Sequence, residues 1–295
     1  MKVIPGESSS GGLAAPEEPS PSNFPATGTK ELQNASASVR FVSYNIHSGI
    51  GADRRHDVSR IARALDECDA AVVALQEVDV GRRRTDFAHQ ANHIGQELGM
   101  HVHFHPALEI EDEDYGDAIL TKMPSRLMKA GLLPGLKHRP RLEPRGAIWV
   151  EIEIGGQAIQ VINTHLGLNR RERMAQVEEL LGERWLGSPL CRDPVVLLGD
   201  FNALPRSTVF ARLAGALTDA RRTAPEGRSP ATFPSRFPLL RLDHVFTRGA
   251  VTVRSLAVPR TPLTRAASDH LPLVVELEFD PGTKTSTHVP DRRPA

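Results

Sequence analysis

Polar side chains that could bind a cation or move a proton follow or interrupt most of the apolar runs in this sequence. In chain order they are Asn45, Glu77, His165, Asp200, Asn202, Asp243, Asp269 and His270. A carboxylate at the end of an apolar strand is costly to bury without a partner, so its repetition needs an explanation. Gathered at one end of a sheet, these groups would offer hard oxygen ligands and imidazoles. Such ligands suit Mg²⁺, Mn²⁺ or Ca²⁺ better than zinc.

The same residue types meet the chemical needs of phosphoester hydrolysis. A phosphodiester is anionic, so its hydrolysis requires a cation, hydrogen-bond donors and an aligned nucleophile. The alternative interpretation is capping and turn chemistry, because Asp-x-Asn after a strand, as at Asp200 and Asn202, is also a good turn. That interpretation suits any one of these residues, whereas the full set favours a catalytic site.

Strands and helices alternate along the chain and would position these residues. Apolar and β-branched runs predict strands over 40–44, 70–75, 116–121, 147–154, 157–164, 195–198, 242–247, 251–258 and 271–279. Apolar residues at helical spacing predict helices over 58–65, 88–98 and 174–185, the first two behind N-caps at Asp57 and Asp86. Gly155-Gly156 predicts a two-residue hairpin turn between two of the strands.

The mixture of hairpins with strand–helix–strand units predicts an α/β fold. Two packed, mainly antiparallel sheets flanked by helices fit it better than one parallel sheet. Residues 40–280 would form this body, which is long enough to bury a large core. Residues 1–39 are rich in Ser, Pro and Gly, and residues 281–295 are similar. Both are predicted to be disordered tails, because they bury too little apolar surface to offset the entropy of ordering.

Composition excludes several classes of protein. Lys and Arg number 36 and Asp and Glu number 36, so strong affinity for duplex DNA is not expected. The two cysteines, Cys68 and Cys191, exclude a disulfide framework and a cysteine zinc site of the usual spacing. No apolar run approaches the roughly 18 residues of a transmembrane helix. No signal peptide is evident, so a cytoplasmic location is expected.

Seven short motifs, in their order and spacing, carry a resemblance to a known family. They are SYNIH, LQEVD, GDAIL, NTHLG, GDFNA, LDHVF and SDHLPL. They resemble the endonuclease/exonuclease/phosphatase superfamily, which includes DNase I-like nucleases, apurinic endonucleases, sphingomyelinases and inositol-polyphosphate 5-phosphatases. The resemblance extends from about Arg40 to Phe279. It implies a DNase I-like four-layer sandwich and a metal-dependent phosphoesterase.

Motif matching also implies which residues bind the metal and the substrate. The implied metal ligands are Asn45, Glu77 and Asp269. The implied cofactor is Mg²⁺, with Mn²⁺ as an alternative. Arg145 and Tyr115 would contact the substrate, Arg145 through a phosphate, although a surface salt bridge also accounts for this arginine.

The resemblance further implies a catalytic role for five residues. Asp200 would position or deprotonate the attacking water, and Asn202 would donate to a phosphoryl oxygen. His165 and His270 would stabilise the transition state. Asp243 would orient His270, as carboxylates orient imidazoles elsewhere.

The chain departs from the family pattern at several places. Gly116-Asp117 stands where the family commonly has Gly-Asn, so Asp117 either adds charge that tunes the site or has no catalytic role. His244 stands where an aromatic residue is usual, and it is expected to pack rather than to catalyse. LDHVF lacks the Trp-Cys-Asp-Arg signature of the inositol-polyphosphate 5-phosphatases, which disfavours that activity.

The predicted function is therefore metal-dependent hydrolysis of a phosphodiester by a monomer. The substrate could be a lipid headgroup, a nucleotide or a nucleic acid. Two alternatives stay open: a nuclease acting on DNA or RNA, and a non-catalytic binding member of the same fold. The complete set of ligands and histidines argues against the non-catalytic alternative.

Three other clusters admit two interpretations each. The histidines at 89, 93, 101, 103 and 105 have spacings that could hold a transition metal, but a solvated edge is the preferred interpretation. The acidic run 109–114 is expected to be a solvated loop. The arginines at 82–84 and 170–173 would either contact substrate phosphate or form solvated charge clusters.

Overall fold

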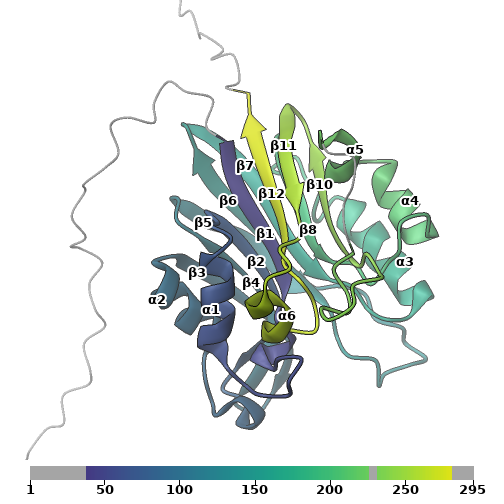
Figure 1. Ribbon diagram of the computed structural model, residues 1–295. Coiled ribbons are helices and arrows are strands. Elements are labelled where there is room, and N and C mark those ends of the chain that lie inside the picture. Colours follow the sequence, from purple (N-terminus) through teal and green to yellow (C-terminus); the bar gives the residue numbers. More distant parts are fainter. Residues whose placement is uncertain (1–37, 226–230, 281–295) are drawn as a thin grey trace, which may run out of the picture.

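A computed structural model describes residues 38–225 and 231–280 of the chain. The two predicted tails lie outside these residues, except for Ser38 and Val39, which begin the first strand. Strands β1 to β12 form two six-stranded sheets that pack face to face (Figure 1). None of the described helices has the length and apolar character that a membrane crossing requires.

The first sheet has the strand order β11-β12-β1-β2-β4-β3. Only β1 and β2 run parallel within it; the other neighbours are antiparallel. Its strands are β1 (Ser38–Asn45), β2 (Val72–Val80), β3 (His101–Ile110), β4 (Glu113–Thr121), β11 (Val251–Ala257) and β12 (Leu273–Phe279).

The second sheet has the order β5-β6-β7-β8-β10-β9, and only β7 and β8 run parallel. Its strands are β5 (Ser125–Leu132), β6 (Gly146–Ile154), β7 (Gln157–His165), β8 (Val195–Asp200), β9 (Thr218–Asp219) and β10 (Asp243–Arg248). The predicted turn at Gly155-Gly156 is confirmed, because both glycines have positive φ angles between β6 and β7.

The core lies between the two sheets and under the helices on their outer faces. Buried side chains such as Phe41 and Ile119 meet Val161 and Leu198 between the sheets. Burial of each such aliphatic or aromatic side chain contributes about 1.5–3 kcal/mol. Separate apolar clusters lie under α1 (Val58–Asp66) and α2 (Gln90–Leu98), and under α3 (Arg170–Leu181) and α4 (Thr208–Ala214). The predicted four-layer sandwich is therefore confirmed.

Capping side chains begin the helices that cover the sheets. The Asp57 carboxylate accepts from the Arg60 N–H and begins α1 as predicted, and Asn169 caps α3 through the Arg171 N–H. Ser207 and Thr261 cap α4 and α6 (Pro262–Ala267) in the same way. The remaining elements are α5 (Ala220–Thr223) and two 3₁₀ turns, η1 (His47–Gly49) and η2 (Arg83–Thr85).

The structure corrects some predicted boundaries. Asp86 does not cap α2; it ends the preceding 3₁₀ turn in the left-handed conformation, and His89 is the cap. The third helix ends at Leu181, and Trp185 lies beyond it in the core, because Gly182 leaves the helical conformation. Strand β5 was not predicted, since its half-exposed sequence lacks a continuous apolar run.

The acidic run is the tip of the β3–β4 hairpin rather than a free loop. Glu113 and Asp114 lie within β4, and the turn between the strands falls at Glu111 and Asp112. Glu113 pairs with Arg82, so part of this charge is neutralised within the chain.

Candidate active site

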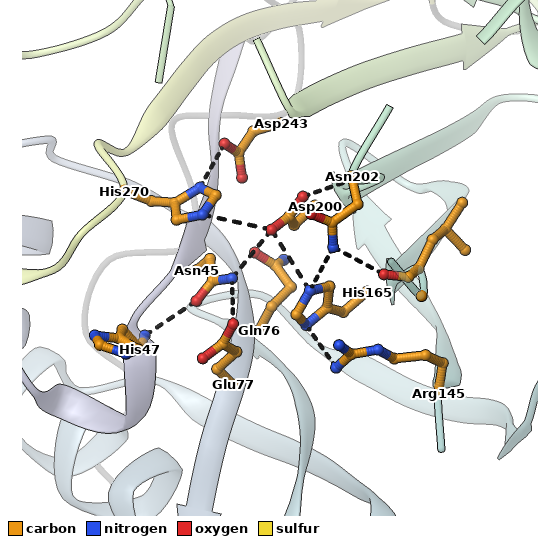
Figure 2. Close-up of polar contacts among 12 residues, drawn as sticks. Asn45, His47, Gln76, Glu77, Arg145, His165, Asp200, Asn202, Asp243 and His270 are labelled. Atoms are coloured by element: carbon orange, nitrogen blue, oxygen red, sulfur yellow. Dashed lines mark hydrogen bonds and ion pairs between the residues drawn. The ribbon is translucent and has the colours of Figure 1, made fainter. Parts of the chain in front are cut away.

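Strand pairing brings the polar residues at the strand ends to one end of the sandwich. Asn45 lies opposite Gln76 in the parallel β1–β2 pair, directly before Glu77. His165 lies opposite Asp200 in the parallel β7–β8 pair, and Asp243 lies opposite Asp200 across β10. Since both parallel pairs end here and β10 begins here, residues far apart in sequence converge (Figure 2).

Two backbone features allow this convergence. Glu77 has a left-handed φ of 59° at an irregularity between Leu75 and Val78, which turns its side chain out of the strand's regular alternation. Gly199 has a φ of 149°, and a Cβ atom there would lie 1.9 Å from the Thr164 carbonyl oxygen. Only glycine therefore lets β8 pass so close to β7 immediately before Asp200.

His270 lies between two carboxylates. Its Nδ1 is 2.9 Å from Asp243 Oδ2, and its Nε2 is 3.6 Å from Asp200 Oδ2 (Figure 2). Burial alone lowers the pKa of His270, but the charges of Asp243 and Asp200 outweigh burial and raise it to about 10. Burial raises the pKa of Asp200 to about 6, with His270 opposing the rise. At neutral pH, His270 is therefore an imidazolium beside ionised Asp200.

The Asn45 side chain joins the two halves of the site. Its Nδ2 donates to Glu77 Oε1 at 2.9 Å and to Asp200 Oδ2 at 3.1 Å. Its Oδ1 accepts from the His47 backbone N–H at 3.0 Å, which determines the orientation of the amide. Burial raises the pKa of Glu77, and the nearby Asp269 charge adds to this effect.

His165 has a different environment from His270. Its Nδ1 lies 3.2 Å from Arg145 Nη1. Because a guanidinium can only donate and the Asp200 carboxylate accepts, these two contacts favour the tautomer in which Nδ1 accepts and Nε2, 3.5 Å from Asp200 Oδ2, carries the proton. Burial, together with the positive charge of Arg145, lowers the pKa of His165 well below its usual value. Asn202 Nδ2 lies 3.1 Å from Nε2, and because both atoms are donors in this tautomer, the amide donates to the Leu166 carbonyl at 2.9 Å instead. His165 is thus a neutral hydrogen-bond donor.

Arg145 lies beside His165, and the Tyr115 side chain is hydrogen-bonded to Arg145. Arg145 is buried, and it forms an ion pair at 2.5 Å with the exposed carboxylate of Glu143. The guanidinium carbons of Arg82 and Arg84 lie 5.9 and 5.6 Å from the centre of the Tyr115 ring. Burial raises the pKa of Tyr115, and the Glu77 charge raises it further. Both residues are therefore placed at the candidate site.

Asp117, the departure from Gly-Asn, is a buried neutral acid. Burial raises its pKa to about 8, against the opposing charge of Arg145. At neutral pH it is protonated and adds no full negative charge to the site. A protonated carboxyl resembles an asparagine side chain in shape and can also donate a hydrogen bond. Aspartate can therefore occupy the position where the family commonly has asparagine.

We expect Asp117→Asn to stabilise the protein increasingly as the pH rises. Below pH 4 the acid is protonated in both folded and unfolded states. Between pH 4 and 8 the folded state holds a proton that the unfolded state has lost, so wild-type stability falls with pH. The amide removes this dependence. Melting temperatures measured in EDTA at pH 5 and pH 8 test this, and an equal shift at both values would contradict it.

Three residues of the site were not predicted from the sequence. His47, inside the SYNIH motif, points Nδ1 at the Ile50 carbonyl at 3.0 Å and lies 3.9 Å from Asp269 Oδ1. Gln76 donates across the two sheets to Asn163 Oδ1 at 2.7 Å, and Asn163 donates back to the Leu75 carbonyl at 2.8 Å. The sequence signal that could have identified Gln76 and Asn163 is a polar amide residue inside an otherwise apolar strand. This amide pair ties the strands of Glu77 and His165 together.

The histidines at 89, 93, 101, 103 and 105 do not assemble into a metal site. His93 contacts Glu97 and Ser59, His103 contacts Ser125, and no group of three metal-ligand side chains in 38–225 and 231–280 contains them. His244 packs among phenylalanine rings and contacts the Ala203 carbonyl at 2.7 Å, as expected of a structural residue.

One cluster of metal-ligand side chains stands out among the described residues, and two further carboxylates, Glu77 and Asp269, lie near it. Ligand atoms of Asp200, Asp243 and His270 lie within 4.8 Å of one another. In that group the proton on His270 already supplies a positive charge between the carboxylates. Glu77 and Asp269 are different: no Lys or Arg in the described part of the chain forms an ion pair with either. Their hard oxygen atoms suit Mg²⁺ or Mn²⁺, while Asn45 turns its Nδ2 toward Glu77 and donates to that carboxylate.

Comparison with known proteins agrees with this geometry. The family model described as Endonuclease/Exonuclease/phosphatase family matches residues 42–270. The uncharacterized protein YbhP of Escherichia coli K12 is 28% identical over 266 residues, covering 84% of this chain and 99% of that protein.

Solved structures show the same fold. An endonuclease/exonuclease/phosphatase from Beutenbergia cavernae has a TM-score of 0.67 at 21% identity, covering 82% of this chain and 72% of its own. A mannosyl-6-phosphatase of Bacteroides thetaiotaomicron has a TM-score of 0.65 at 18% identity, covering 82% of this chain and 100% of its own.

Proposed function

The chain belongs to the endonuclease/exonuclease/phosphatase family, which is hydrolytic, and from this premise we propose that it is a divalent-metal-dependent phosphodiester hydrolase. The observation that carries the proposal is the convergence of three side-chain nitrogens on Asp200 Oδ2. They are Asn45 Nδ2 at 3.1 Å, His165 Nε2 at 3.5 Å and His270 Nε2 at 3.6 Å. A phosphoryl oxygen beside Asp200 would meet the same donors.

Glu77, Asp269 and Asn45 would hold the metal ion in this proposal. The support is the chemistry of the two carboxylates, to which no Lys or Arg is ion-paired within the described residues, and the hydrogen bond by which Asn45 Nδ2 holds Glu77. A bound divalent ion would supply Lewis-acid stabilisation of charge on the phosphoryl group. His47, through its contact with Asp269, would help to keep that carboxylate in place.

The protein's own groups have distinct parts in the proposed reaction. Ionised Asp200 accepts a proton from the attacking water, whose oxygen forms the new bond to phosphorus as the bond to the leaving oxygen breaks. The His270 imidazolium, oriented by Asp243 at 2.9 Å, donates to the phosphoryl oxygen on which charge grows. Neutral His165 and the Asn202 amide donate to the same group.

Arg145 would bind the substrate phosphate while keeping His165 neutral. Its contact with Nδ1 leaves the Nε2 proton of His165 directed into the site. Tyr115 packs beside it and would shape the pocket around the alcohol part of the substrate. The zero formal charge of the chain disfavours a duplex-DNA nuclease, which needs a basic surface. Lipid-headgroup and nucleotide diesters fit the proposal better.

The purified protein is expected to hydrolyse bis(p-nitrophenyl) phosphate in Mg²⁺ or Mn²⁺. The rate should exceed that in EDTA by about 100-fold or more, since a metal ion contributes several kcal/mol of charge stabilisation. Absorbance of released nitrophenol measures it. His270→Ala, purified in parallel, controls for contaminating hydrolases.

A rate that EDTA leaves unchanged would contradict the metal dependence. If no metal supports hydrolysis of this diester or of lipid and nucleotide diesters, the non-catalytic alternative would replace the proposal. Calorimetric titration of Mg²⁺ would then show whether Glu77 and Asp269 still bind a cation.

A further inference from the structure

Large apolar side chains project into solvent from loops at the catalytic end of the sandwich. Leu168 is 73% exposed, Phe237 is 76% exposed and Leu239 is 80% exposed, and Leu204 and Leu240 are exposed as well. They belong to three loops, which we call the rim loops: residues 166–169, 203–207 and 231–242. Exposed apolar residues concentrated at one end of a protein indicate an interaction surface.

Strand topology places all three rim loops beside the catalytic residues. The first follows His165 at the end of β7, and the second follows Asn202 just after β8. The third leads into Asp243 at the start of β10, opposite Asp200. The apolar side chains are therefore carried by the chain segments that also carry the site.

The third rim loop is held firmly and contacts the site directly. Phe233 and Leu240 form a β-bridge, and the Leu239 N–H donates to the Phe233 carbonyl at 2.9 Å. The Phe233 ring lies 4.8 Å from the His270 ring, and the Ser235 N–H donates to the Asp269 carbonyl at 2.6 Å. Phe237 and Leu239 are thus exposed on a braced loop whose base packs on a catalytic histidine.

Cationic side chains line a pocket beside the first rim loop. The pocket has a volume of about 670 Å³ and lies between the 133–145 segment and the N-terminal ends of α3 and α4. Its lining includes His138, Arg139, Arg170 and Arg171, and within the described residues it contains no carboxylate. Arg139 and Arg171 form no ion pair with a described carboxylate. These charges are available to an external anion.

The 133–145 segment also belongs to the catalytic end. It leads into β6, whose Ala147 lies opposite Thr164, next to His165. The acidic tip at 109–114 also lies at the catalytic end, beside the end of β2, but it belongs to the other sheet and does not line this pocket. The exposed Leu168 and the unpaired arginines of the pocket therefore lie on adjoining segments of the second sheet, while Phe237 and Leu239 lie on a separate loop at the same end.

We propose that the rim loops dock the catalytic end onto an anionic phospholipid bilayer. Isolated apolar side chains on separate loops suit insertion into the boundary between headgroups and acyl chains, while the neighbouring arginines bind lipid phosphates. A protein partner would more commonly meet one continuous apolar face. This inference rests on the proposed function. With the catalytic end facing the bilayer, the substrate would be a phosphoester carried by a lipid headgroup of that bilayer.

Vesicle sedimentation tests the docking. In EDTA, the wild-type protein is expected to bind phosphatidylcholine vesicles that contain phosphatidylglycerol, and to bind pure phosphatidylcholine more weakly. Phe237→Ser with Leu239→Ser should weaken partition by at least about tenfold, because both side chains lose their apolar burial. Arg139→Ser with Arg171→Ser should weaken binding to the anionic vesicles by about 25-fold, about fivefold for each arginine.

The matched control is Leu190→Ser. Leu190 is 61% exposed but precedes β8, at the opposite end of the sandwich from Asp200. It should leave vesicle binding unchanged. Hydrolysis of bis(p-nitrophenyl) phosphate should be unchanged in the Phe237/Leu239 variant and in this control, because these solvent-exposed side chains have no part in the proposed binding or catalysis.

The outcomes separate docking from catalysis. Metal-dependent hydrolysis without vesicle binding, or binding that the Phe237/Leu239 variant retains in full, overturns the docking and leaves the proposed function intact. Variant-sensitive vesicle binding without hydrolysis of any diester supports the docking and overturns the catalytic premise. Concentration-dependent dimers that the Phe237/Leu239 change abolishes, with no vesicle binding, would make the rim loops an interface between copies and overturn the proposal.

Discussion

Replacing His270 by alanine is expected to lower kcat for phosphodiester hydrolysis by about 10³- to 10⁴-fold. The variant loses the imidazolium that Asp243 and Asp200 hold protonated, and with it the charged donor to the phosphoryl group. KM should change much less, because the lost interaction strengthens mainly in the transition state. Steady-state kinetics in saturating Mg²⁺ measures both.

Removing His270 also leaves the buried Asp200 and Asp243 without their shared partner, which destabilises the fold by about 3–5 kcal/mol. His270→Gln is therefore made in parallel, since it keeps a hydrogen-bond donor and much of the volume. His103→Ala, at a half-buried histidine that contacts Ser125, should keep wild-type activity. A folded His270→Gln protein with a rate close to wild type would exclude the assigned role.

Glu77→Gln is expected to weaken Mg²⁺ binding by about 100-fold or more. Loss of a residue that only hydrogen-bonds to a metal ligand costs about 10–100-fold in metal affinity. Because Glu77 is proposed to bind the metal directly, its loss should cost at least as much. The substitution keeps the size of the side chain and removes its charge. The Mg²⁺ concentration that gives half-maximal activity measures the change, and calorimetry measures it independently of turnover.

Glu153→Gln provides the matched control for this variant. Glu153 is exposed on β6, near the end of the sandwich opposite to Asp200. Its removal should leave the Mg²⁺ titration unchanged. A Glu77→Gln protein with the wild-type titration midpoint would remove Glu77 from the ligands and direct attention to Asp200, Asp243 and His270.

The two histidines of the site differ in charge because their neighbours differ. His270 lies between carboxylates and is protonated, whereas His165 meets the Arg145 guanidinium and is neutral. A charged donor and a neutral donor thus face the same carboxylate oxygen of Asp200. The arrangement limits the net positive charge in the buried site while keeping two N–H groups directed into it.

Local patterns in the sequence were sufficient for much of the fold and for naming polar residues that the structure brings together. Apolar runs that end in Glu77, His165 and Asp200 indicated strands with polar ends, and the structure places those ends together. Boundaries that depend on one backbone conformation were less predictable. Asp86 has good capping chemistry but adopts a left-handed φ of 54°, so His89 begins the helix instead.

The sequence by itself determined the residue types, their order and their positions at strand ends, because these follow from local apolar periodicity and motif spacing. Only the tertiary structure decided what each group does next to the others. Asp117 is neutral, Arg145 is buried against His165, and the Gln76–Asn163 pair joins the sheets. The physical reason is that protonation and hydrogen bonding depend on burial and on charges contributed by distant strands, which adjacency in sequence does not encode.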